Sequence, residues 1–372
     1  MRKIGITGQN GFVGYHLYQT VKLYNEEFSL VDFDRSFFED ESKLDAFVGD
    51  CDVIVHLAAL NRHNDPEVIY EMNTGLVNKL VSSLERTKSK AHVIISSSTQ
   101  EERDNLYGKS KKEGRLMLSD WANKSGGTFT GMVIPNVYGP FGNPFYNSVI
   151  ATFCHQVSHG ETPKIEVDGL LKLIYVGELV EEIIKAIRSK DNTHDMQIPH
   201  TGESKVSEIL KLLEYYKEVY QEKGEFPSLS NAFEHKLFNT YRCYMDIKNY
   251  FPRKFIQHPD NRGAFTEIAR IGIPGQVSFS TTVPEITRGN HFHTRKIERF
   301  AVIKGKALIQ LRKIGTTEVY NFYLDGTEPA YVDMPIWYTH NIKNIGEDTL
   351  YTIFWINEPY DEKDPDTWFE VV

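Results

Sequence analysis

Three side chains in the first third of the chain have the types and spacing needed to move a proton at a carbonyl group. Tyr107 and Lys111 lie four residues apart, so on a helix they share one face. An ammonium beside a phenol favours the phenolate, so we expect Lys111 to lower the pKa of Tyr107 towards neutral pH. Ser98 ends a serine-rich segment and can hydrogen-bond the same carbonyl oxygen. The trio predicts hydride transfer with a nicotinamide, although the Tyr–Lys pair alone also fits an ordinary exposed helix pair.

A glycine-rich turn follows the first apolar segment. Its spacing, G-x-x-G-x-x-G, opens a predicted helix whose first N–H groups can bind a pyrophosphate. Gly8 permits the tight turn, Gly11 lets the phosphates approach, and Gly14 allows the helix to pack closely on the strand. The residues expected to contact a dinucleotide here are Thr7, Gly8, Gly11, Phe12, Val13 and Gly14.

Two side chains near the end of the second apolar segment affect the choice between NADH and NADPH. Asp32 stands where an acidic side chain can hydrogen-bond the adenine ribose 2′-hydroxyl. Arg35 can instead pair with a 2′-phosphate. The two residues leave the choice of cofactor open, and both are also compatible with simple solvation of a strand end.

Four residues in the last third of the chain are of the types that bind transition metals. His291 and His293 alternate on a predicted strand and therefore point to the same face. Glu298 and the distant His340 can complete a site of three imidazoles and one carboxylate. Such donors suit Zn²⁺, Fe²⁺, Mn²⁺ or Ni²⁺. An exposed polar alternation is the simpler explanation of an H-x-H strand taken alone.

Two different kinds of fold are predicted to position these residues. The first 136 residues alternate Ile- and Val-rich strands with helices, the pattern of a parallel sheet covered on both faces. From about Phe255, short segments alternate with period two between Gly, Pro and Asn turns, as in a β-sandwich or small barrel. We expect the less regular residues 137–245 to pack beside the parallel sheet. The predicted strands are 3–7, 28–33, 52–57, 92–96 and 129–134, then 276–281, 298–303, 307–312, 318–324, 330–332 and 349–355.

The predicted fold class is therefore an α/β, Rossmann-type parallel sheet with helices on both faces, followed by an all-β domain. We place the boundary near residue 245. Residues 1–245 form the predicted NAD(P)-binding domain and residues 246–372 the predicted metal-binding domain. The predicted helices are 11–24, 41–48, 66–87, 107–124, 176–189 and 205–223.

The composition of the chain excludes several classes of protein. Its 372 residues, 40% of them hydrophobic, suffice for two or three domains with large cores. The formal net charge is −9 without any cluster of Lys and Arg, so nucleic acid is not an expected partner. Three widely spaced cysteines fit a reducing compartment, and no apolar stretch reaches the roughly 18 residues of a membrane span. We expect a cytoplasmic protein with no membrane insertion.

Residues 1–245 resemble the extended short-chain dehydrogenase/reductase family. The resemblance is carried by the glycine turn, by the strand end at residues 55–59 (Val-His-Leu-Ala-Ala), by Ser98 and by the Y-x-x-x-K motif. The resemblance implies a Rossmann sheet acting on nucleotide sugars. It implies that Ser98, Tyr107 and Lys111 are catalytic, and that Ser98 also binds substrate. It further implies cofactor contacts from Leu57, Ala58, Tyr107 and Lys111.

The segment after the fifth strand, P-N-V-Y-G-P, also resembles this family, and Asn136 within it would contact the substrate. Two departures matter. The gap between Ser98 and Tyr107 is unusually short, and Thr99-Gln100 replaces the Asp-Glu pair that 4,6-dehydratases use. Simple carbonyl reduction is therefore favoured over dehydration.

The histidine segments resemble the two cupin motifs, H-x-H-x(4)-E with Gly305 and P-x(4)-H-x(3)-N around His340. The resemblance implies a jelly-roll barrel that binds a metal through His291, His293, Glu298 and His340. The first motif lacks its upstream glycine, and Trp337 stands where the second usually has glycine. The role of the metal, structural or Lewis-acidic, stays open.

A short-chain reductase joined to a cupin is a rare pairing, and the whole chain resembles a family of bifunctional bacterial capsule and O-antigen synthesis enzymes. The resemblance implies a homodimer with Zn²⁺ in the cupin and a UDP-sugar as substrate. The cupin would epimerise C3 of a UDP-4-keto-6-deoxy-N-acetylhexosamine. The reductase would then reduce C4 with NADPH (NADH being possible), giving UDP-2-acetamido-2,6-dideoxy-talose on the route to UDP-N-acetyl-L-fucosamine.

The order of these steps follows from chemistry, because the 4-keto group acidifies the C3–H bond and that acidity disappears once C4 is reduced. Two alternatives stay open. The first is a nucleotide-sugar 4-epimerase, or a plain 4-ketoreductase with a structural cupin. The second is a non-catalytic dinucleotide sensor.

Overall fold

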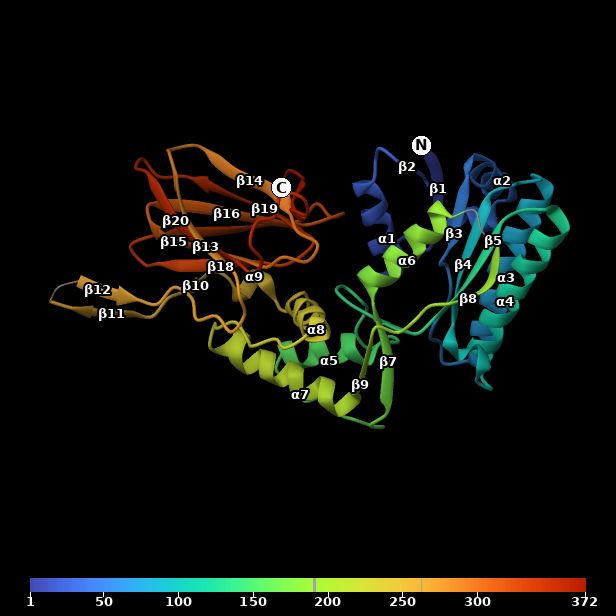
Figure 1. Cartoon of the computed structure of the whole chain (residues 1–372), viewed down its shortest axis with the longest axis horizontal. Helices are drawn as coiled ribbons and strands as arrows, with labels where there is room; N and C mark the ends of the chain where they lie inside the picture. The colour runs from blue at the N-terminus through green and yellow to red at the C-terminus, as the bar shows by residue number, and fades with distance from the viewer. Residues whose placement is uncertain (190–191, 262) are drawn as a thin grey trace. The chain divides into compact units, whose positions relative to one another are not determined.

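The computed structural model describes residues 1–189, 192–261 and 263–372, which form two compact units (Figure 1). The N-terminal unit comprises residues 1–152 and 166–206. The C-terminal unit comprises residues 153–165 and 207–372. The predicted boundary near residue 245 separates the NAD(P)-binding region from the metal-binding region, and it stays a prediction.

Six parallel strands form the main sheet of the N-terminal unit, in the order β2-β1-β3-β4-β5-β8 (Figure 1). Every residue of β3 and β5 is buried, as expected of strands covered on both faces. The strand order reverses direction at β1 and β3, the position where such sheets bind ligands. The strands are β1 (Arg2–Thr7), β2 (Phe28–Val31), β3 (Val53–His56), β4 (His92–Ser98), β5 (Phe129–Ile134) and β8 (Thr193–Gln197).

Helices cover both faces of this sheet. On one face, α1 and α6 share an apolar core with Val55 and Ile94. On the other face, α2, α3 and α4 share a second core with Ile54 and Val93, because neighbouring residues of a strand point to opposite faces. The elements are α1 (Phe12–Leu23), α2 (Glu41–Asp50), α3 (Pro66–Arg86), α4 (Leu106–Ser125) and α6 (Val176–Arg188), with the 3-10 turns η1 (Arg35–Glu39) and η2 (Thr99–Glu102).

A small three-stranded sheet, β6-β7-β9, completes the N-terminal unit. Its strands are β6 (Asn136–Tyr138), β7 (Leu170–Tyr175) and β9 (Gly202–Lys205). The sequence analysis did not predict this sheet, because two of its strands are very short and carry no clear apolar alternation. Helix α5 (Val149–Ser158) begins in this unit and continues into the other.

Two antiparallel five-stranded sheets form the C-terminal unit, in the orders β10-β18-β15-β20-β13 and β17-β16-β19-β14-β21. Both sheets contribute fully buried apolar residues, including Ala301, Val302, Ile309 and Leu311. A separate hairpin, β11-β12, extends from the strands of this unit (Figure 1). The strands are β10 (Arg253–Lys254), β11 (Gln257–Asp260), β12 (Gly263–Thr266), β13 (Gln276–Thr282), β14 (Thr287–Phe292), β15 (Glu298–Lys304), β16 (Lys306–Lys313), β17 (Val319–Asp325), β18 (Ala330–Met334), β19 (Tyr338–Asn344), β20 (Leu350–Ile356) and β21 (Trp368–Phe369).

The helices between residues 207 and 245 belong to the C-terminal unit, whereas the sequence analysis grouped them with the parallel sheet. A buried polar network explains the difference. Arg299 on β15 forms an ion pair with Asp333 on β18 (2.7 and 2.9 Å) and donates to the carbonyl of Gly224, while Tyr220 donates to Asp333 (2.7 Å). Buried charges require such partners, so the network ties the helices to the strands. The elements are α7 (Val206–Tyr216), the π-helix η3 (Lys217–Glu222), α8 (Ala232–Arg242) and α9 (Ile247–Tyr250).

The structure confirms the predicted fold class, a parallel Rossmann-type sheet with helices on both faces followed by an all-β arrangement of antiparallel sheets. Each strand predicted in the two regions lies within two or three residues of a strand in the structure. Of the helices that the structure describes, none combines the length and the apolar composition required to span a membrane.

Candidate active site and metal centre

A cavity of about 760 Å³ lies in the N-terminal unit, at the carboxyl ends of the parallel strands. Its volume is in the range of pockets that hold a cofactor or small ligand. The walls come from the segments after β1, β3, β4 and β5, from the start of α4 and from the loop after β6. The predicted site residues that line it are Gly8, Gly11, Phe12, Val13, Gly14, Arg35, Leu57, Ala58, Ser98, Tyr107, Lys111 and Asn136.

The glycine turn has no room for side chains at two positions. Gly8 has a φ of +78°, and a Cβ there would lie 2.7 Å from the backbone nitrogen of Ala58. A Cβ on Gly14 would lie 2.1 Å from the carbonyl oxygen of Gly8. The start of α1 therefore faces the cavity as bare backbone, which fits a pyrophosphate. Thr7 does not line the cavity; its buried hydroxyl lies 2.9 Å from Nδ1 of His56 and supports the turn.

The structure separates the two predicted ribose contacts. Arg35, the first residue of η1, lines the cavity, whereas Asp32 is exposed and lies outside the lining. Asp34 caps η1 by accepting a hydrogen bond from the backbone N–H of Ser36 (2.8 Å). Gln9 donates to the carbonyl of Phe33 (2.7 Å) and so joins this segment to the glycine turn. Of the two residues, the arginine is the one placed to meet a ligand in the cavity.

Ser98, Tyr107 and Lys111 meet in the same cavity. Ser98 is the last residue of β4, and Tyr107 and Lys111 occupy successive turns at the start of α4. The side chains of Ser98 and Tyr107 are hydrogen-bonded to each other. Asn136, at the start of β6, also lines the cavity and donates Nδ2 to the carbonyl of Lys172 (3.2 Å). The cavity thus holds a hydroxyl pair and a buried ammonium, which come from the end of β4 and the first turns of α4.

The expected direction of the Tyr107 pKa was wrong. Burial raises the pKa of Tyr107 to about 12, and its hydrogen bond with Ser98 only partly offsets this rise. Burial also lowers the pKa of Lys111 to about 8, while the charge of Glu101 acts to raise it. For Tyr107, desolvation of the phenolate outweighs the hydrogen bond with Ser98. Tyr107 is therefore protonated at neutral pH.

The turn η2 fills the short gap between Ser98 and Tyr107 and packs tightly on α4. A Cβ on Gly108 would lie 2.0 Å from the carbonyl oxygen of Gln100, so the contact requires glycine. Glu101 in η2 forms a buried bidentate ion pair with Arg115 on α4 (2.9 and 2.7 Å). This pair fixes the serine relative to the tyrosine and lysine. The sequence analysis missed it, although Arg115 follows Lys111 by one helical turn.

Tyr146 is a further cavity residue, to which the sequence analysis assigned no role. Its hydroxyl oxygen accepts a hydrogen bond from the backbone N–H of Asn61 (3.1 Å). The guanidinium of Arg62 donates to the carbonyls of Phe145 and Tyr146 (2.8 Å each). These bonds tie the loop after β6 to the segment after β3. Because no motif defines this loop, only the folded structure reveals its place in the site.

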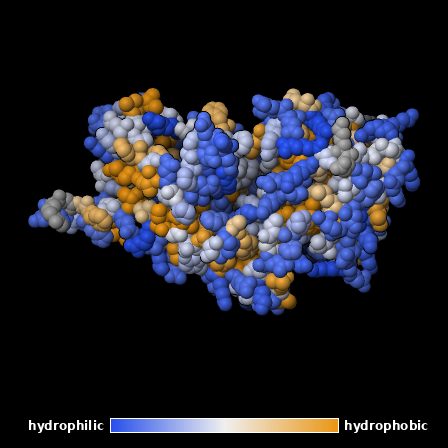
Figure 2. All heavy atoms as spheres, in the orientation of Figure 1, coloured by the Kyte–Doolittle hydropathy of each residue, from blue (hydrophilic) through white to orange (hydrophobic). Residues whose placement is uncertain are grey.

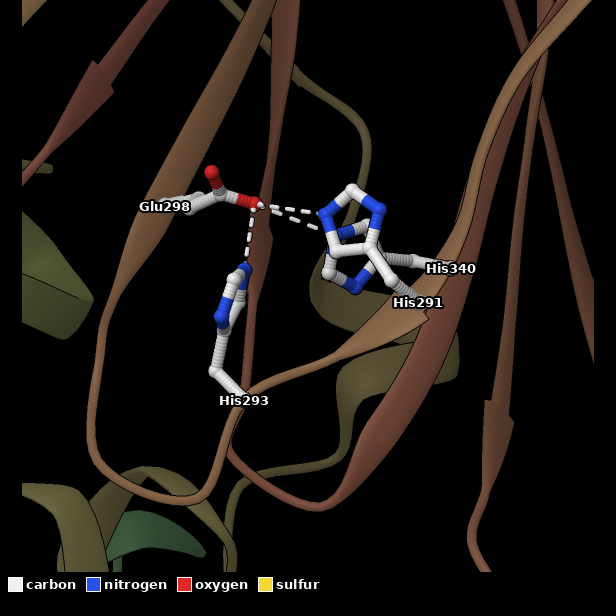
Figure 3. Close-up of side chains that lie close together, drawn as sticks. All are labelled: His291, His293, Glu298 and His340. Carbon is white, nitrogen blue, oxygen red and sulfur yellow. Dashed lines mark hydrogen bonds and ion pairs between the residues drawn. The ribbon is translucent and has the colours of Figure 1, made fainter. Parts of the chain in front are cut away.

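Four side chains of the C-terminal unit converge on one point (Figure 3). His291 on β14, His293 just after it, Glu298 on β15 and His340 on β19 place their ligand atoms within 4.8 Å of one another. Oε2 of Glu298 lies 3.1 Å from Nε2 of His293 and of His340, and 3.8 Å from Nε2 of His291. The two shorter spacings are close to the roughly 3.3 Å between tetrahedral ligands held about 2.0–2.1 Å from a zinc ion, and the spacing to His291 is longer.

Backbone carbonyls orient two of the imidazoles. Nδ1–H of His293 donates to the carbonyl of Asp366 (2.5 Å), and Nδ1–H of His340 donates to that of Tyr338 (3.1 Å). Both rings therefore present Nε2 to the shared point. Burial acts to raise the pKa of Glu298, but the neighbouring imidazoles of His291, His293 and His340 bring it well below the usual range, so the carboxylate is charged. The donor set fits a divalent transition metal.

Comparisons with known proteins match both regions of the chain. The model of the NAD dependent epimerase/dehydratase family matches residues 4–198, and that of the polysaccharide biosynthesis C-terminal domain matches residues 258–368. The chain therefore belongs to the NAD dependent epimerase/dehydratase family. It is of the two-domain type represented by the capsular polysaccharide assembling protein CapF, as the sequence resemblance implied.

Three relatives illustrate the extent of the similarity. CapF from Staphylococcus aureus is 34% identical, with a TM-score of 0.63, over 100% of both chains. UDP-2-acetamido-2,6-beta-L-arabino-hexul-4-ose reductase from Pseudomonas aeruginosa is 30% identical over 98% of each chain. RMD from Pseudomonas aeruginosa, solved in complex with NADPH, is 18% identical with a TM-score of 0.52, over 57% of this chain and 81% of its own. This third likeness shows a shared fold.

Proposed function

We propose that this protein is a bifunctional nucleotide-sugar enzyme. The C-terminal unit epimerises C3 of a UDP-4-keto-6-deoxy-N-acetylhexosamine, and the N-terminal unit reduces C4 with NADPH. The product is UDP-2-acetamido-2,6-dideoxy-talose, on the route to UDP-N-acetyl-L-fucosamine for capsule or O-antigen. One observation carries the proposal: Ser98, Tyr107 and Lys111 line a cavity behind a dinucleotide turn, in a chain that also brings three imidazoles and a carboxylate together. The name of the Pseudomonas reductase supports a UDP-linked hexul-4-ose as substrate.

Reduction at C4 uses the three cavity residues in sequence. A nicotinamide bound in the cavity would supply the hydride that C4 receives. Tyr107, protonated at neutral pH, donates its proton to the C4 oxygen, which becomes a hydroxyl. Ser98 hydrogen-bonds that oxygen while negative charge develops on it. The Lys111 ammonium stabilises the tyrosinate that remains until solvent returns the proton.

Arg35 favours NADPH over NADH, because a guanidinium at the cavity wall can pair with the 2′-phosphate that NADH lacks. Gly8, Gly11 and Gly14 would hold the pyrophosphate against bare backbone. The pyrophosphate fits this turn because glycine leaves space there, and a Cβ on Gly8 or Gly14 would collide with backbone atoms.

Epimerisation at C3 has to precede reduction. A divalent metal held by His291, His293, Glu298 and His340 would act as a Lewis acid on a substrate oxygen, and Zn²⁺ is the ion we favour among Zn²⁺, Fe²⁺, Mn²⁺ and Ni²⁺. His291 is 24% exposed, whereas His293 and His340 are at most 3% exposed, so the cluster has one accessible side. Loss of the C3 proton and its return to the opposite face complete the step.

We also propose that the enzyme is a homodimer and acts in the cytoplasm on a soluble UDP-sugar. Strand β13 lies at the edge of its sheet and exposes Val277 and Phe279, and Figure 2 shows apolar side chains exposed over this unit. An apolar edge strand favours pairing with a second copy. Light scattering during size-exclusion chromatography tests this: a dimer is expected for the wild type, and a monomer would contradict it.

The proposed activity is tested by incubating the enzyme with the UDP-4-keto-6-deoxy-N-acetylhexosamine and either NADPH or NADH, while following loss of the reduced nicotinamide. We expect stoichiometric NADPH consumption, slower NADH consumption, and a product reduced at C4 and inverted at C3 by NMR. Product without net cofactor consumption would indicate a 4-epimerase instead. Tight cofactor binding without turnover of any UDP-4-keto-sugar would indicate a sensor.

A further inference from the structure

The last residues of the chain contact the strands that carry the proposed metal ligands. β21 pairs with β14, so that Phe369 lies opposite His291 and Trp368 opposite Phe292. The hydroxyl of Thr339, the neighbour of His340, donates to the carbonyl of Glu370. The C-terminal segment therefore contacts two of the three strands that carry the ligands.

Asp366 makes the most direct of these contacts, through its carboxylate. Oδ1 accepts hydrogen bonds from the backbone N–H (3.0 Å) and hydroxyl (2.7 Å) of Thr294. Oδ2 accepts hydrogen bonds from the backbone N–H groups of Arg295 (2.9 Å) and Lys296 (3.1 Å). These are the first three of the four residues in the turn between His293 and Glu298. One carboxylate thus binds every backbone N–H of the first three residues that join two of the ligands.

The main chain of Asp366 contacts the first of those ligands. Its carbonyl accepts the Nδ1–H of His293 (2.5 Å), which leaves Nε2 facing Glu298. The residue is 4% exposed and has a φ of +43°, a conformation that side-chain-bearing residues rarely adopt. A strained backbone persists when the surrounding contacts determine it, and here those contacts are the hydrogen bonds to residues 294–296. The hydrogen bonds that hold the carboxylate of Asp366 therefore also fix the position of its carbonyl.

We infer that Asp366 is a positioning residue of the metal centre: its side chain holds the turn between His293 and Glu298, and its carbonyl sets the orientation of the His293 ring. The inference rests on the proposed metal centre and extends it to a residue that lies outside both histidine motifs. Partners of metal-bound histidines in other proteins change metal affinity by about 10–100-fold when removed. Substituting Asp366 removes the carboxylate and keeps the carbonyl, so the effect on affinity should not exceed this range.

The test measures zinc affinity directly, by competition with a chromogenic chelator, on the full-length chain. We expect Asp366→Ala to weaken Zn²⁺ binding about 10–100-fold and to alter the visible spectrum of the Co²⁺-loaded protein, which reports ligand geometry. The matched control is Asp364→Ala, because Asp364 is an exposed carboxylate that pairs with Arg295 on the protein surface. The control is expected to bind zinc as the wild type does.

Asp366→Asn keeps one acceptor oxygen and serves as the second variant, should Asp366→Ala fail to fold by circular dichroism. It is expected to bind zinc more weakly than the wild type and more tightly than a folded Asp366→Ala. Wild-type affinity and an unchanged Co²⁺ spectrum in a folded Asp366 variant would overturn the inference while leaving the metal centre intact. A wild-type protein that takes up no zinc would overturn the proposed metal centre, and the inference with it.

Discussion

The two sites of this molecule are built in different ways. In the N-terminal unit, the reactive groups follow parallel strands, and the glycine turn, Ser98 and Tyr107 lie at strand ends or helix starts. In the C-terminal unit, the ligands come from three antiparallel strands, and their second contacts come from a residue near the end of the chain. The first site is thus set by topology and local turns. The second depends on pairings between segments far apart in sequence.

This difference predicts how each site responds to amino-acid substitutions. The proposed reductase site should lose function mainly when a reacting group is removed. The metal centre shares its ligands, turn and C-terminal segment in one network, so changes at several places should reach the metal. The following experiments separate the two sites, beginning with the largest expected effect.

Removing two metal ligands should disable the C-terminal unit alone. We expect His291→Ala combined with His293→Ala to lose bound metal, since two of the four donors are gone, and to reduce C3 exchange to background. NADPH affinity should not change. Metal content by elemental analysis and C3 exchange by NMR check this, and full metal content in the double variant would refute the site.

Removing the acid should disable the N-terminal unit alone. We expect Tyr107→Phe to lower kcat for NADPH oxidation by about 10²–10⁴-fold, the usual contribution of a general acid. NADPH binding and C3 exchange should persist, because the cofactor turn and metal centre are untouched. Stopped-flow absorbance and NMR measure the two steps separately. A near-normal rate of NADPH oxidation would show that another group donates the proton.

A smaller effect is expected at the cofactor wall. Arg35→Ala should weaken NADPH binding by about 10–100-fold, the range of a lost hydrogen bond to a charged group. NADH binding should change little, because NADH has no 2′-phosphate. Titration calorimetry with both cofactors gives the comparison. Equal losses for NADPH and NADH would mean that Arg35 supports the pocket rather than reading the phosphate.

The smallest effect concerns the Glu101–Arg115 pair and has a defined sign. Lys111 is charged below its pKa of about 8 and loses that charge as pH rises, so the alkaline limb of kcat/KM should reflect it. Glu101 raises this pKa, so Glu101→Gln should move the alkaline limb to lower pH.

The pH profile of kcat/KM from neutral to alkaline pH measures that shift. Glu27→Gln is the matched control, because Glu27 forms an exposed bidentate pair with Arg188 in the same unit, and its profile should match the wild type. An alkaline limb that stays in place in Glu101→Gln would assign it to another group.

The sequence predicted some features of each region and not others. The parallel strands and their helices were predicted well, because apolar runs alternate with amphipathic segments. The ligands His291, His293, Glu298 and His340 were also predicted to come together, and the structure brings them within one cluster. In the first case the residue pattern reports local geometry, whereas in the second two separate motifs indicate that distant strands come together.

Other features depend on burial and on distant contacts, and the sequence could not reveal them. The pKa of Tyr107 rises rather than falls, because burial is a property of the packed cavity. Residues 207–245 pack with the C-terminal strands through the buried Arg299–Asp333 network, which has no signature in either segment. Asp366 likewise belongs to no motif; its role follows from a left-handed backbone and hydrogen bonds to residues about 70 positions away.

The most direct test of the central claim, two chemical steps in one chain, is to run the complete reaction with NADPH in deuterated water. The account predicts NADPH consumption together with deuterium at C3 of the product, because the C3 proton is exchanged with solvent before C4 is reduced. Reduction at C4 with hydrogen retained at C3 would contradict it, and would leave the C-terminal unit without a catalytic role.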